Sequence, residues 1–336
     1  MSPLVWDISV AYYGNCYPHH ITRDLKEIAE CGFTSITLYV NELELLRHKN
    51  IKRFTILSAH DLGLRVFIDM HGFGFFVPSS FSYLVPQNPE FWQIDNRGKV
   101  RPLRGCPNNP NYKEWIKGRI YEAINKLNPD GMFWDEPCLA PSQDWPDVWT
   151  CRCKYCISKF KEEYGYTMPI NINEDIIEFR ERSVYGFLAD ILSYVKEVNS
   201  QILNILCLMP EFTGRYGIRS WDCIKELSDL DVFATDPYWI WFNKPFEWFV
   251  EQARKCIEIA RKARIKSQIW VELIKIPKGR EEDVYKSVIK AADLGADAIA
   301  TWSFRAECGS DLSAEDPDTA WQAFIRSIKK IMEVKA

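Results

Sequence analysis

Short runs of apolar, β-branched or aromatic residues alternate along this chain with longer segments in which apolar residues recur every three or four positions. The first pattern is typical of buried strands and the second of amphipathic helices. Eight strands are predicted, at residues 5–11, 35–40, 65–70, 131–134, 202–208, 231–235, 268–272 and 298–302. Helices are predicted between and after them, at 21–30, 42–59, 112–126, 174–199, 218–227, 247–263, 281–294 and 319–333.

This order of elements predicts the fold class. Eight strand-then-helix units in one chain imply parallel strands joined by crossover helices. The economical closure is an α/β fold of the (β/α)₈ type, a TIM barrel. A doubly wound open sheet with an additional domain is the alternative. No linker or internal repeat divides the sequence, so residues 1–336 are predicted to form a single barrel domain.

Two connections are much longer than the others. Residues 71–110 follow the third predicted strand, and residues 137–173 follow the fourth. Both lead from a strand into the next helix, so in a barrel both lie on the C-terminal face, where active sites of such barrels are built. Loops of this length are usually functional, and we expect these two insertions to shape the site.

Carboxylates stand at several predicted strand ends. The apolar run 131–134 stops at Asp135 and Glu136, and a proline follows. Four other strand ends carry a carboxylate, namely Asp69, Glu211, Asp236 and Glu272. A single carboxylate at such a place is more often a helix cap or a surface charge. Paired carboxylates, however, suit glycoside hydrolysis, in which one protonates the leaving oxygen and the other attacks or activates water.

Aromatic residues gather at the same strand ends. They are Trp134, Tyr238, Trp239, Trp241, Trp270 and Trp302. Flat aromatic faces suit the apolar face of a sugar ring. A catalytic metal site of the amidohydrolase type would need several histidines, but of the five histidines only His71 lies at a strand end. A phosphate-binding site would need glycine-rich turns after the last two strands, and these turns lack them. The strand ends therefore favour a carbohydrate substrate.

Composition narrows the partners. A net charge of −4 offers no basic field for a nucleic acid, and no apolar run approaches the roughly 20 residues that span a bilayer. No basic start with an apolar run after it opens the sequence, so we expect a cytoplasmic protein. Most of the eleven cysteines are then expected to be reduced thiols or metal ligands. Homo-oligomers are common among such barrels, and a homo-oligomer is compatible with this sequence.

Three segments resemble a known family. They are NPEFWQIDNRGKVRPLRGCPNNPNYKEWI (88–116), GMFWDEP (131–137) and CRCKYCISKFKEEYG (151–165). In this order they resemble family 42 β-galactosidases and related hypothetical glycoside hydrolases of the retaining (β/α)₈ superfamily, clan A. The likeness in layout covers roughly residues 1–305, and it is specific in motif between 88 and 166. It implies that Glu136 is the acid/base, that Glu272 is the nucleophile, and that four cysteines hold a structural zinc.

The four cysteines that match the family pattern are Cys106, Cys151, Cys153 and Cys156. The spacing of the last three is itself typical of a tetrahedral zinc site, and a structural site needs a fourth ligand. Cys106 is the only cysteine in the preceding long loop, and Cys138 is the alternative fourth ligand. A zinc ion held in this way would join the two insertions.

One residue departs from the family pattern. Asp135 stands where the family has an asparagine; an ionised aspartate only accepts hydrogen bonds, whereas an asparagine also donates them. The sugar, the linkage and the anomer therefore stay open. Besides the two glutamates, we expect substrate contacts from a set of strand-end residues: Asp69, His71, Asp135, Glu211, Asp236, Tyr238 and Trp302. An acid/base needs a raised pKa, whereas a nucleophile must stay ionised. The pKa of Glu272 is therefore expected to be lower than that of Glu136.

The sequence thus predicts a retaining glycosidase that acts on a small oligosaccharide or glycoside. Two alternatives remain beside it. One keeps the fold but uses Asp135 in an inverting mechanism. The other is a carbohydrate-binding barrel without catalysis.

Overall fold

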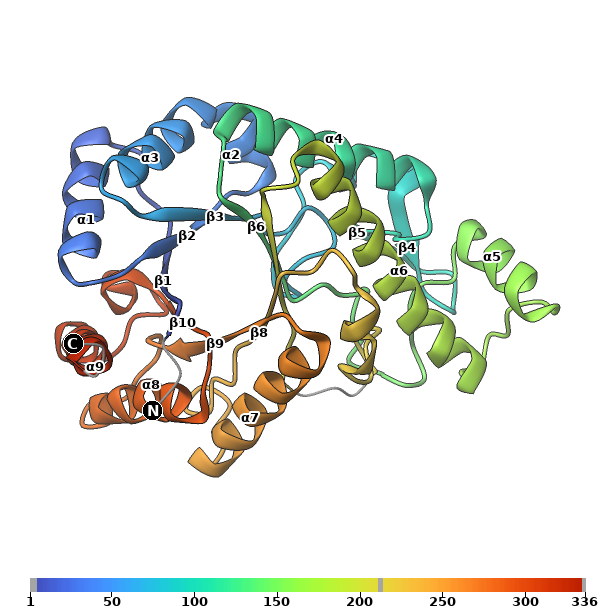
Figure 1. Ribbon diagram of the computed structural model, residues 1–336. Helices are drawn as coiled ribbons and strands as arrows, with labels where there is room; N and C mark the ends of the chain where they lie inside the picture. The colour runs from blue at the N-terminus through green and yellow to red at the C-terminus, as the bar shows by residue number, and fades with distance from the viewer. Residues whose placement is uncertain (1–4, 211–213, 334–336) are drawn as a thin grey trace.

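The computed structural model describes residues 5–210 and 214–333. Eight parallel strands close into a barrel in the order β1-β10-β9-β8-β7-β6-β3-β2 (Figure 1). They are β1 (Asp7–Tyr12), β2 (Ser35–Tyr39), β3 (Arg65–Asp69), β6 (Gly131–Asp135), β7 (Leu203–Cys207), β8 (Val232–Thr235), β9 (Lys266–Glu272) and β10 (Ala298–Trp302). The first and last strands pair, with Asp7 opposite Ala298. The predicted (β/α)₈ barrel is confirmed.

Helices surround the barrel as the apolar periodicity predicts (Figure 1). They are α1 (Pro18–Glu30), α2 (Glu42–Arg47), α3 (Lys49–Asp61), α4 (Pro110–Leu127), α6 (Glu174–Val198), α7 (Phe246–Ala263), α8 (Glu281–Leu294) and α9 (Pro317–Glu333). Side chains of Asn41, Asn109 and Asn173 accept backbone N–H groups at the starts of α2, α4 and α6. In the part of the chain that is described, no helix is both long and apolar enough to cross a bilayer.

Two predicted helices differ from the structure. The segment 42–59 is divided into α2 and α3 at His48, whose φ of −117° and ψ of 21° leave the helical region. The helix predicted at 218–227 is wrong: the segment holds only the 3₁₀ turn η3 (Asp222–Glu226). Trp221 and Ile224 are buried there, which explains the apolar spacing.

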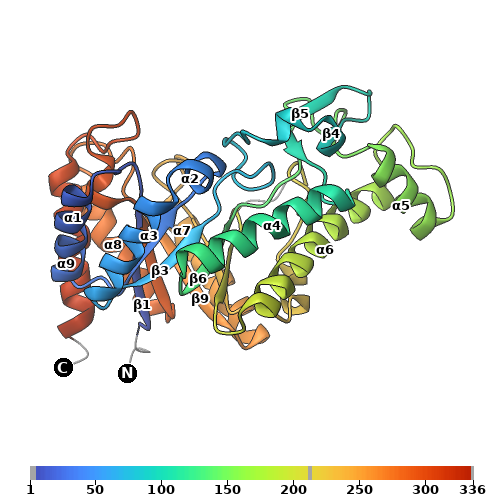
Figure 2. The same ribbon diagram turned by 90° about the horizontal axis from the view of Figure 1, so that it is seen from above.

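The two insertions contain elements that the sequence pattern did not predict. The first holds η1 (Val85–Gln87), η2 (Pro89–Phe91) and an antiparallel hairpin of β4 (Trp92–Ile94) and β5 (Val100–Gly105). The second holds α5 (Lys154–Tyr164). Both lie together beyond one side of the barrel (Figures 1 and 2). An isolated bridge between Asp95 and Thr150 joins them. The assignment of the whole chain to one domain stays a prediction.

The barrel interior is an apolar layer with a carboxylate layer above it. Its apolar side chains are Ala11, Phe67, Phe133, Ile205, Cys207, Val232, Ala234, Trp270 and Ala300. Successive side chains of a strand alternate between faces, so the residue two positions later also points inward. Two positions after Phe67, Phe133, Ala234 and Trp270 come Asp69, Asp135, Asp236 and Glu272. Strand register alone therefore places four carboxylates at one end of the barrel.

Candidate active site

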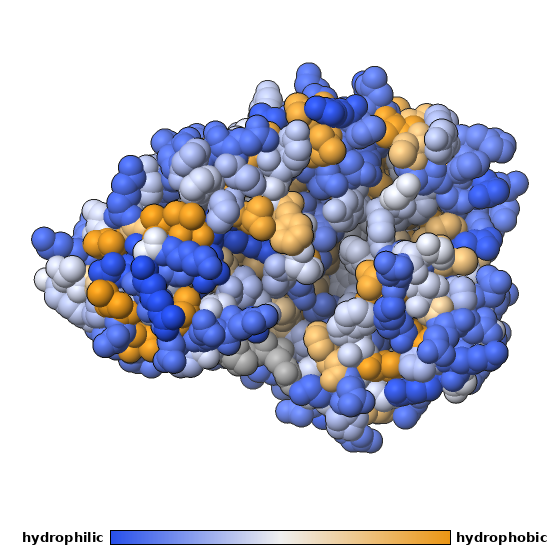
Figure 3. All heavy atoms as spheres, turned by 180° about the vertical axis from the view of Figure 1, so that it is seen from behind, coloured by the Kyte–Doolittle hydropathy of each residue, from blue (hydrophilic) through white to orange (hydrophobic). Residues whose placement is uncertain are grey.

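A cavity of about 600 Å³ opens at the C-terminal ends of the strands. Figure 3, which looks onto this face, shows a hollow near its middle with hydrophobic side chains on its rim. Six of the residues predicted to act in catalysis or to contact substrate line the cavity: His71, Asp135, Glu136, Asp236, Tyr238 and Trp302. Trp241 and Trp270 add further aromatic wall. The cavity therefore combines carboxylates with aromatic surface.

Glu136 is held in the cavity by an unusual backbone. Its φ of +40° lies in the left-handed region, which costs a side-chain-bearing residue roughly 1–2 kcal/mol. Its N–H donates to the carbonyl of Cys207 at 3.0 Å, which fixes this conformation. Adjacent residues of a regular strand face opposite sides, but this turn lets both Asp135 and Glu136 face the cavity. Strain of this kind that the surroundings hold in place is typical of functional sites.

The cavity carboxyls are poorly solvated. Burial raises the pKa of Glu136 to about 7, although a hydrogen bond with Asp236 works in the opposite direction. Burial first, and then the charges of neighbouring carboxylates, also raise the pKa of Asp69, Asp135 and Asp236. At neutral pH the group therefore holds protons that isolated carboxylates would lose.

Several polar atoms of the site have no hydrogen-bond partner among the described residues. They are both carboxylate oxygens of Asp69, Oδ1 of Asp236 and both ring nitrogens of His71. Unpaired buried polar atoms are costly and rare. A cluster of them beside a cavity indicates a ligand that supplies the missing hydrogen bonds.

His71 is neutral in this site. Its ring lies 4.4 Å from that of Tyr39, measured between centroids. Burial and the nearby guanidinium of Arg104 lower the pKa of His71 to about 3. Arg104 also shapes the cavity wall, because it donates to the carbonyls of Val77 at 2.9 Å and Ser80 at 3.1 Å.

Glu272 lies at the end of β9, as predicted, but it differs from Glu136 in its contacts. Its two oxygens accept the backbone N–H groups of Ile240 at 2.7 Å and Trp241 at 2.8 Å. Its side chain is not part of the cavity lining. Burial raises the pKa of Glu272 to about 7, and the two backbone N–H groups only partly offset this. The pKa of Glu272 is raised as far as that of Glu136, so the expectation that Glu272 titrates lower stays a prediction.

The remaining aromatic and acidic residues named from the sequence do not line the cavity or lie outside the described residues. Glu211 lies outside the described residues. Trp134 faces away from the barrel interior, and its indole donates to Asn204 at 3.1 Å. Trp239 donates to Ser287 at 3.1 Å and does not line the cavity. Sequence reasoning missed Tyr216, a lining residue that follows β7 in a loop without periodicity.

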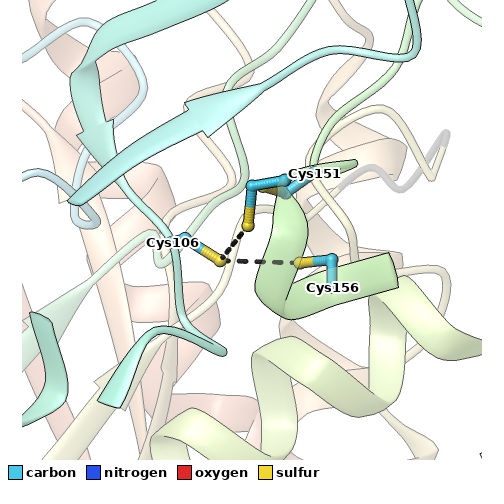
Figure 4. Close-up of side chains that lie close together, drawn as sticks. Cys106, Cys151 and Cys156 are labelled. Atoms are coloured by element: carbon cyan, nitrogen blue, oxygen red, sulfur yellow. Dashed lines mark hydrogen bonds between the residues drawn. The ribbon is translucent and has the colours of Figure 1, made fainter. Parts of the chain in front are cut away.

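Four buried cysteines form a second candidate site, in the two insertions. The ligand atoms of Cys106, Cys151, Cys153 and Cys156 all lie within 4.8 Å of one another, so the group could hold a metal ion. Figure 4 shows the sulfur of Cys106 pointing toward those of Cys151 and Cys156. The sulfur of Cys106 lies 3.5 Å from that of Cys156 and 3.4 Å from that of Cys153. The alternative ligand Cys138 bonds instead to the carbonyl of Phe75.

These sulfur separations fit a tetrahedral ion. Zinc–sulfur bonds of about 2.3 Å place the corners of a tetrahedron roughly 3.8 Å apart. A side-chain N–H of Asn108 also donates to the sulfur of Cys156 at 3.4 Å, in the manner of the outer contacts that orient metal ligands.

Neither a known protein family nor a curated protein matches this sequence. Solved structures match its fold. The β-galactosidase of the Antarctic haloarchaeon Halorubrum lacusprofundi superposes with a TM-score of 0.76 at 16% identity, over 97% of this chain and 58% of its own. For the catalytic domain of β-amylase from Paenibacillus polymyxa the TM-score is 0.71 at 9% identity, over 98% and 100% of the two chains. The endo-β-1,4-mannanase of Thermotoga petrophila superposes with a TM-score of 0.60 at 12% identity, over 100% of this chain and 78% of its own.

The chain thus spans little more than half the length of the β-galactosidase that it resembles. At these identities the likeness concerns the fold. The chain has the (β/α)₈ architecture that these glycoside hydrolases share, as the sequence resemblance implied.

Proposed function

We propose that this protein is a glycosidase that hydrolyses the O-glycosidic bond of a small oligosaccharide or glycoside. The observation that carries the proposal is Glu136, a strained residue with a pKa raised to about 7, in an aromatic-walled cavity among other carboxyls. A carboxylic acid that keeps its proton near neutral pH can donate it to a leaving oxygen. The carbohydrate enzymes with the same fold support this choice.

In the favoured mechanism Glu136 is the general acid/base and Glu272 the nucleophile. The backbone N–H groups of Ile240 and Trp241 orient the carboxylate of Glu272 and favour its charged form. Each of its oxygens keeps a second lone pair, so one can still attack the anomeric carbon. Positive charge that develops on the sugar would stabilise the ionised carboxylate further.

The other predicted residues act as substrate contacts. Tyr238 and Trp302 offer aromatic surface from the cavity wall. Asp69, Asp135 and Asp236 accept hydrogen bonds from sugar hydroxyls, and His71 can donate one and accept another. Glu211 completes the proposed set from outside the described residues.

A second mechanism has its own support. Because Glu272 does not line the cavity whereas Asp135 and Asp236 do, an inverting glycosidase could use Asp135 or Asp236 as the base that activates water. A carbohydrate-binding barrel without catalysis is the third candidate, since the same wall binds sugars without any bond being broken.

A panel of 4-nitrophenyl glycosides, with several sugars in both anomers, tests the function. Turnover of at least one member supports a glycosidase, and sugar binding without any turnover supports the binding barrel. Nuclear magnetic resonance of the first-formed product then gives the anomer, which distinguishes retention from inversion.

Azide rescue tests the two roles. Glu272→Gly should be inactive and regain turnover with azide, forming a glycosyl azide of inverted configuration. Glu136→Ala should still cleave substrates with activated leaving groups, and azide should form a product of retained configuration. Loss of all rescue at Glu272, together with inactivity of Asp135→Asn or Asp236→Asn, would favour the inverting mechanism. Glu162→Gln, an exposed site on α5, is the matched control.

We also propose that the four-cysteine cluster holds a structural zinc ion. When bound, zinc would supply a covalent brace between the β4–β5 insertion and the α5 insertion, with no open position for catalysis. The geometry of the thiols supports this, since four buried sulfurs converge from both insertions.

A further inference from the structure

We propose that the cavity selects a glycoside whose sugar carries a free ammonium group, such as a hexosaminide with an unsubstituted amine. This rests on the proposed glycosidase function and names its substrate class. Among the described residues, the cavity wall holds three carboxylates and no lysine or arginine.

The acceptors of the cavity are carboxylates. Asp135, Glu136 and Asp236 line it. Asp69 belongs to the same inward-facing layer but lies behind the lining. Among the described residues that line the cavity there is no lysine, arginine, asparagine or glutamine. The indole N–H of Trp270 is already used, because it donates to Gln268 at 2.9 Å. The wall also offers hydroxyl and indole donors, from Ser79, Tyr216, Tyr238, Trp241 and Trp302. It offers no cationic side chain, so the charge of the carboxylates, rather than a count of hydrogen bonds, favours a positively charged ligand.

Unpaired atoms give a second and independent observation. Asp69 is fully buried, and neither of its oxygens has a hydrogen-bond partner in the described chain. Asp236 is 9% exposed, and its Oδ1 is likewise unpaired. An ammonium group brings three donors and no acceptor, whereas a hydroxyl brings one donor and two acceptors. The ammonium group therefore matches these atoms better, and bonds between charged partners are the stronger kind.

The charge of the wall also decides against other ligands. Uronic acids and sulfated or phosphorylated sugars would bring a negative charge to a cavity without a cation to pair it. A single metal ion is disfavoured by geometry. Within the described residues, the four cysteines are the one group of three or more potential ligands close enough to share an ion. An ammonium group needs only one or two of these carboxylates within reach, because its remaining hydrogens can bond to other acceptors.

The raised pKa values of the carboxyls agree with this reading. Burial and mutual repulsion raise the pKa of Asp69 and Asp236 in the empty cavity. A cation placed among them lowers the pKa of both, so binding stabilises the charged form that the empty site disfavours.

Isothermal calorimetry with the full chain tests the proposal. The probes are glucosamine, galactosamine and mannosamine, each compared with its neutral parent sugar and its N-acetyl derivative, at about pH 6.5, where the amines are protonated. We expect at least one amine to bind about tenfold or more tightly than its parent and its N-acetyl form. Glucuronate should not bind.

Variants connect the preference to the carboxylates. Asp69→Asn and Asp236→Asn should each reduce the ratio of amine affinity to parent-sugar affinity about fivefold or more, with folding checked by thermal unfolding. Asp293→Asn, exposed on α8, should leave that ratio unchanged. Two aspartate variants are used so that poor folding of one leaves the other informative.

The outcomes separate this inference from the proposed function. Turnover of neutral glycosides, with amines that bind no more tightly than their parents, would overturn the ammonium preference and leave the glycosidase intact. Amine binding without cleavage of the matching nitrophenyl hexosaminides would support the preference and remove the glycosidase. Saturable calcium or magnesium binding that Asp69→Asn abolishes would also overturn the inference, because the cavity would then be a metal site.

Discussion

Glu136→Gln should stabilise the ligand-free protein at alkaline pH while it abolishes acid catalysis. Burial raises the pKa of Glu136 from 4.5 to about 7, so the folded protein must either keep a proton on this carboxyl or bury its charge. Glutamine has nearly the same shape and carries no charge. Its amide oxygen can still accept a hydrogen bond from protonated Asp236, as the carboxylate of Glu136 does.

The sign of the pH dependence follows from linkage. Because the folded-state pKa lies above the unfolded one, this carboxyl contributes stability that is present below about pH 4.5 and lost as the pH rises to 7. The full shift corresponds to a ceiling of about 3 kcal/mol, most of which falls between pH 5 and pH 8. With an unfolding entropy of about 0.7 kcal/mol/K for a chain of this length, the ceiling is roughly 4–5 °C in Tm, of which roughly 3–4 °C falls between pH 5 and pH 8.

Differential scanning calorimetry at pH 5 and pH 8, at equal ionic strength, measures this difference. The quantity of interest is the Tm of the variant minus that of the wild type, because the other carboxyls with raised pKa values affect both proteins equally. We expect a gain of about 3–5 °C at pH 8 and about 1 °C at pH 5. Exposed Glu162→Gln serves as control and should change neither value.

Glu272→Gln makes the test sharper. Burial raises its pKa to about 7 as well, but both oxygens accept backbone N–H groups. An amide nitrogen cannot accept, so this variant leaves one N–H unpaired at a cost of about 1–3 kcal/mol at every pH. If Glu136→Gln gives the same Tm difference at both pH values, or if it destabilises the protein at pH 8, Glu136 is not a desolvated carboxyl and the reasoning fails.

Three further predictions concern the zinc, the departing aspartate and a close contact. The wild type should contain about one zinc ion per chain, and Cys153→Ser should lower both the zinc content and the Tm. A fully stable wild type in which elemental analysis finds no zinc would contradict the proposed zinc site. Asp135→Asn should retain measurable turnover if the residue only contacts the sugar, and a complete loss would point to a role as base. Gly105→Ala should cost about 1–3 kcal/mol in chemical denaturation, because its new Cβ would lie 2.2 Å from the ring of buried Tyr112; an unchanged midpoint would contradict the packing.

The barrel could be predicted because its signals are local. Each strand and most helices show their own hydrophobic period, and the strict alternation of the two leaves few ways to bury every apolar face. The helix predicted at 218–227 failed for a related reason. Trp221 and Ile224 are buried there with helical spacing, but burial in a 3₁₀ turn leaves the same pattern in the sequence.

The long insertions could be located but not resolved into elements. Their β4–β5 hairpin and α5 depend on contacts between two segments far apart in the chain, such as the bridge from Asp95 to Thr150. The choice of Cys106 over Cys138 as the fourth cysteine likewise follows from how these segments meet. The close spacing of Cys151, Cys153 and Cys156 along the chain suggested these three ligands without any knowledge of how the two insertions pack.

The sequence by itself determined that carboxylates and aromatics stand at the ends of several of the eight strands, because strand ends are marked by local composition. Only the tertiary structure decided which of them face a common cavity. Trp134 points out of the barrel and Trp270 points in, and the left-handed turn at Glu136 brings two adjacent carboxylates to one side. The raised pKa values of the carboxyls also depend on the tertiary structure, because they arise from burial and from neighbouring charges that meet only when the barrel closes.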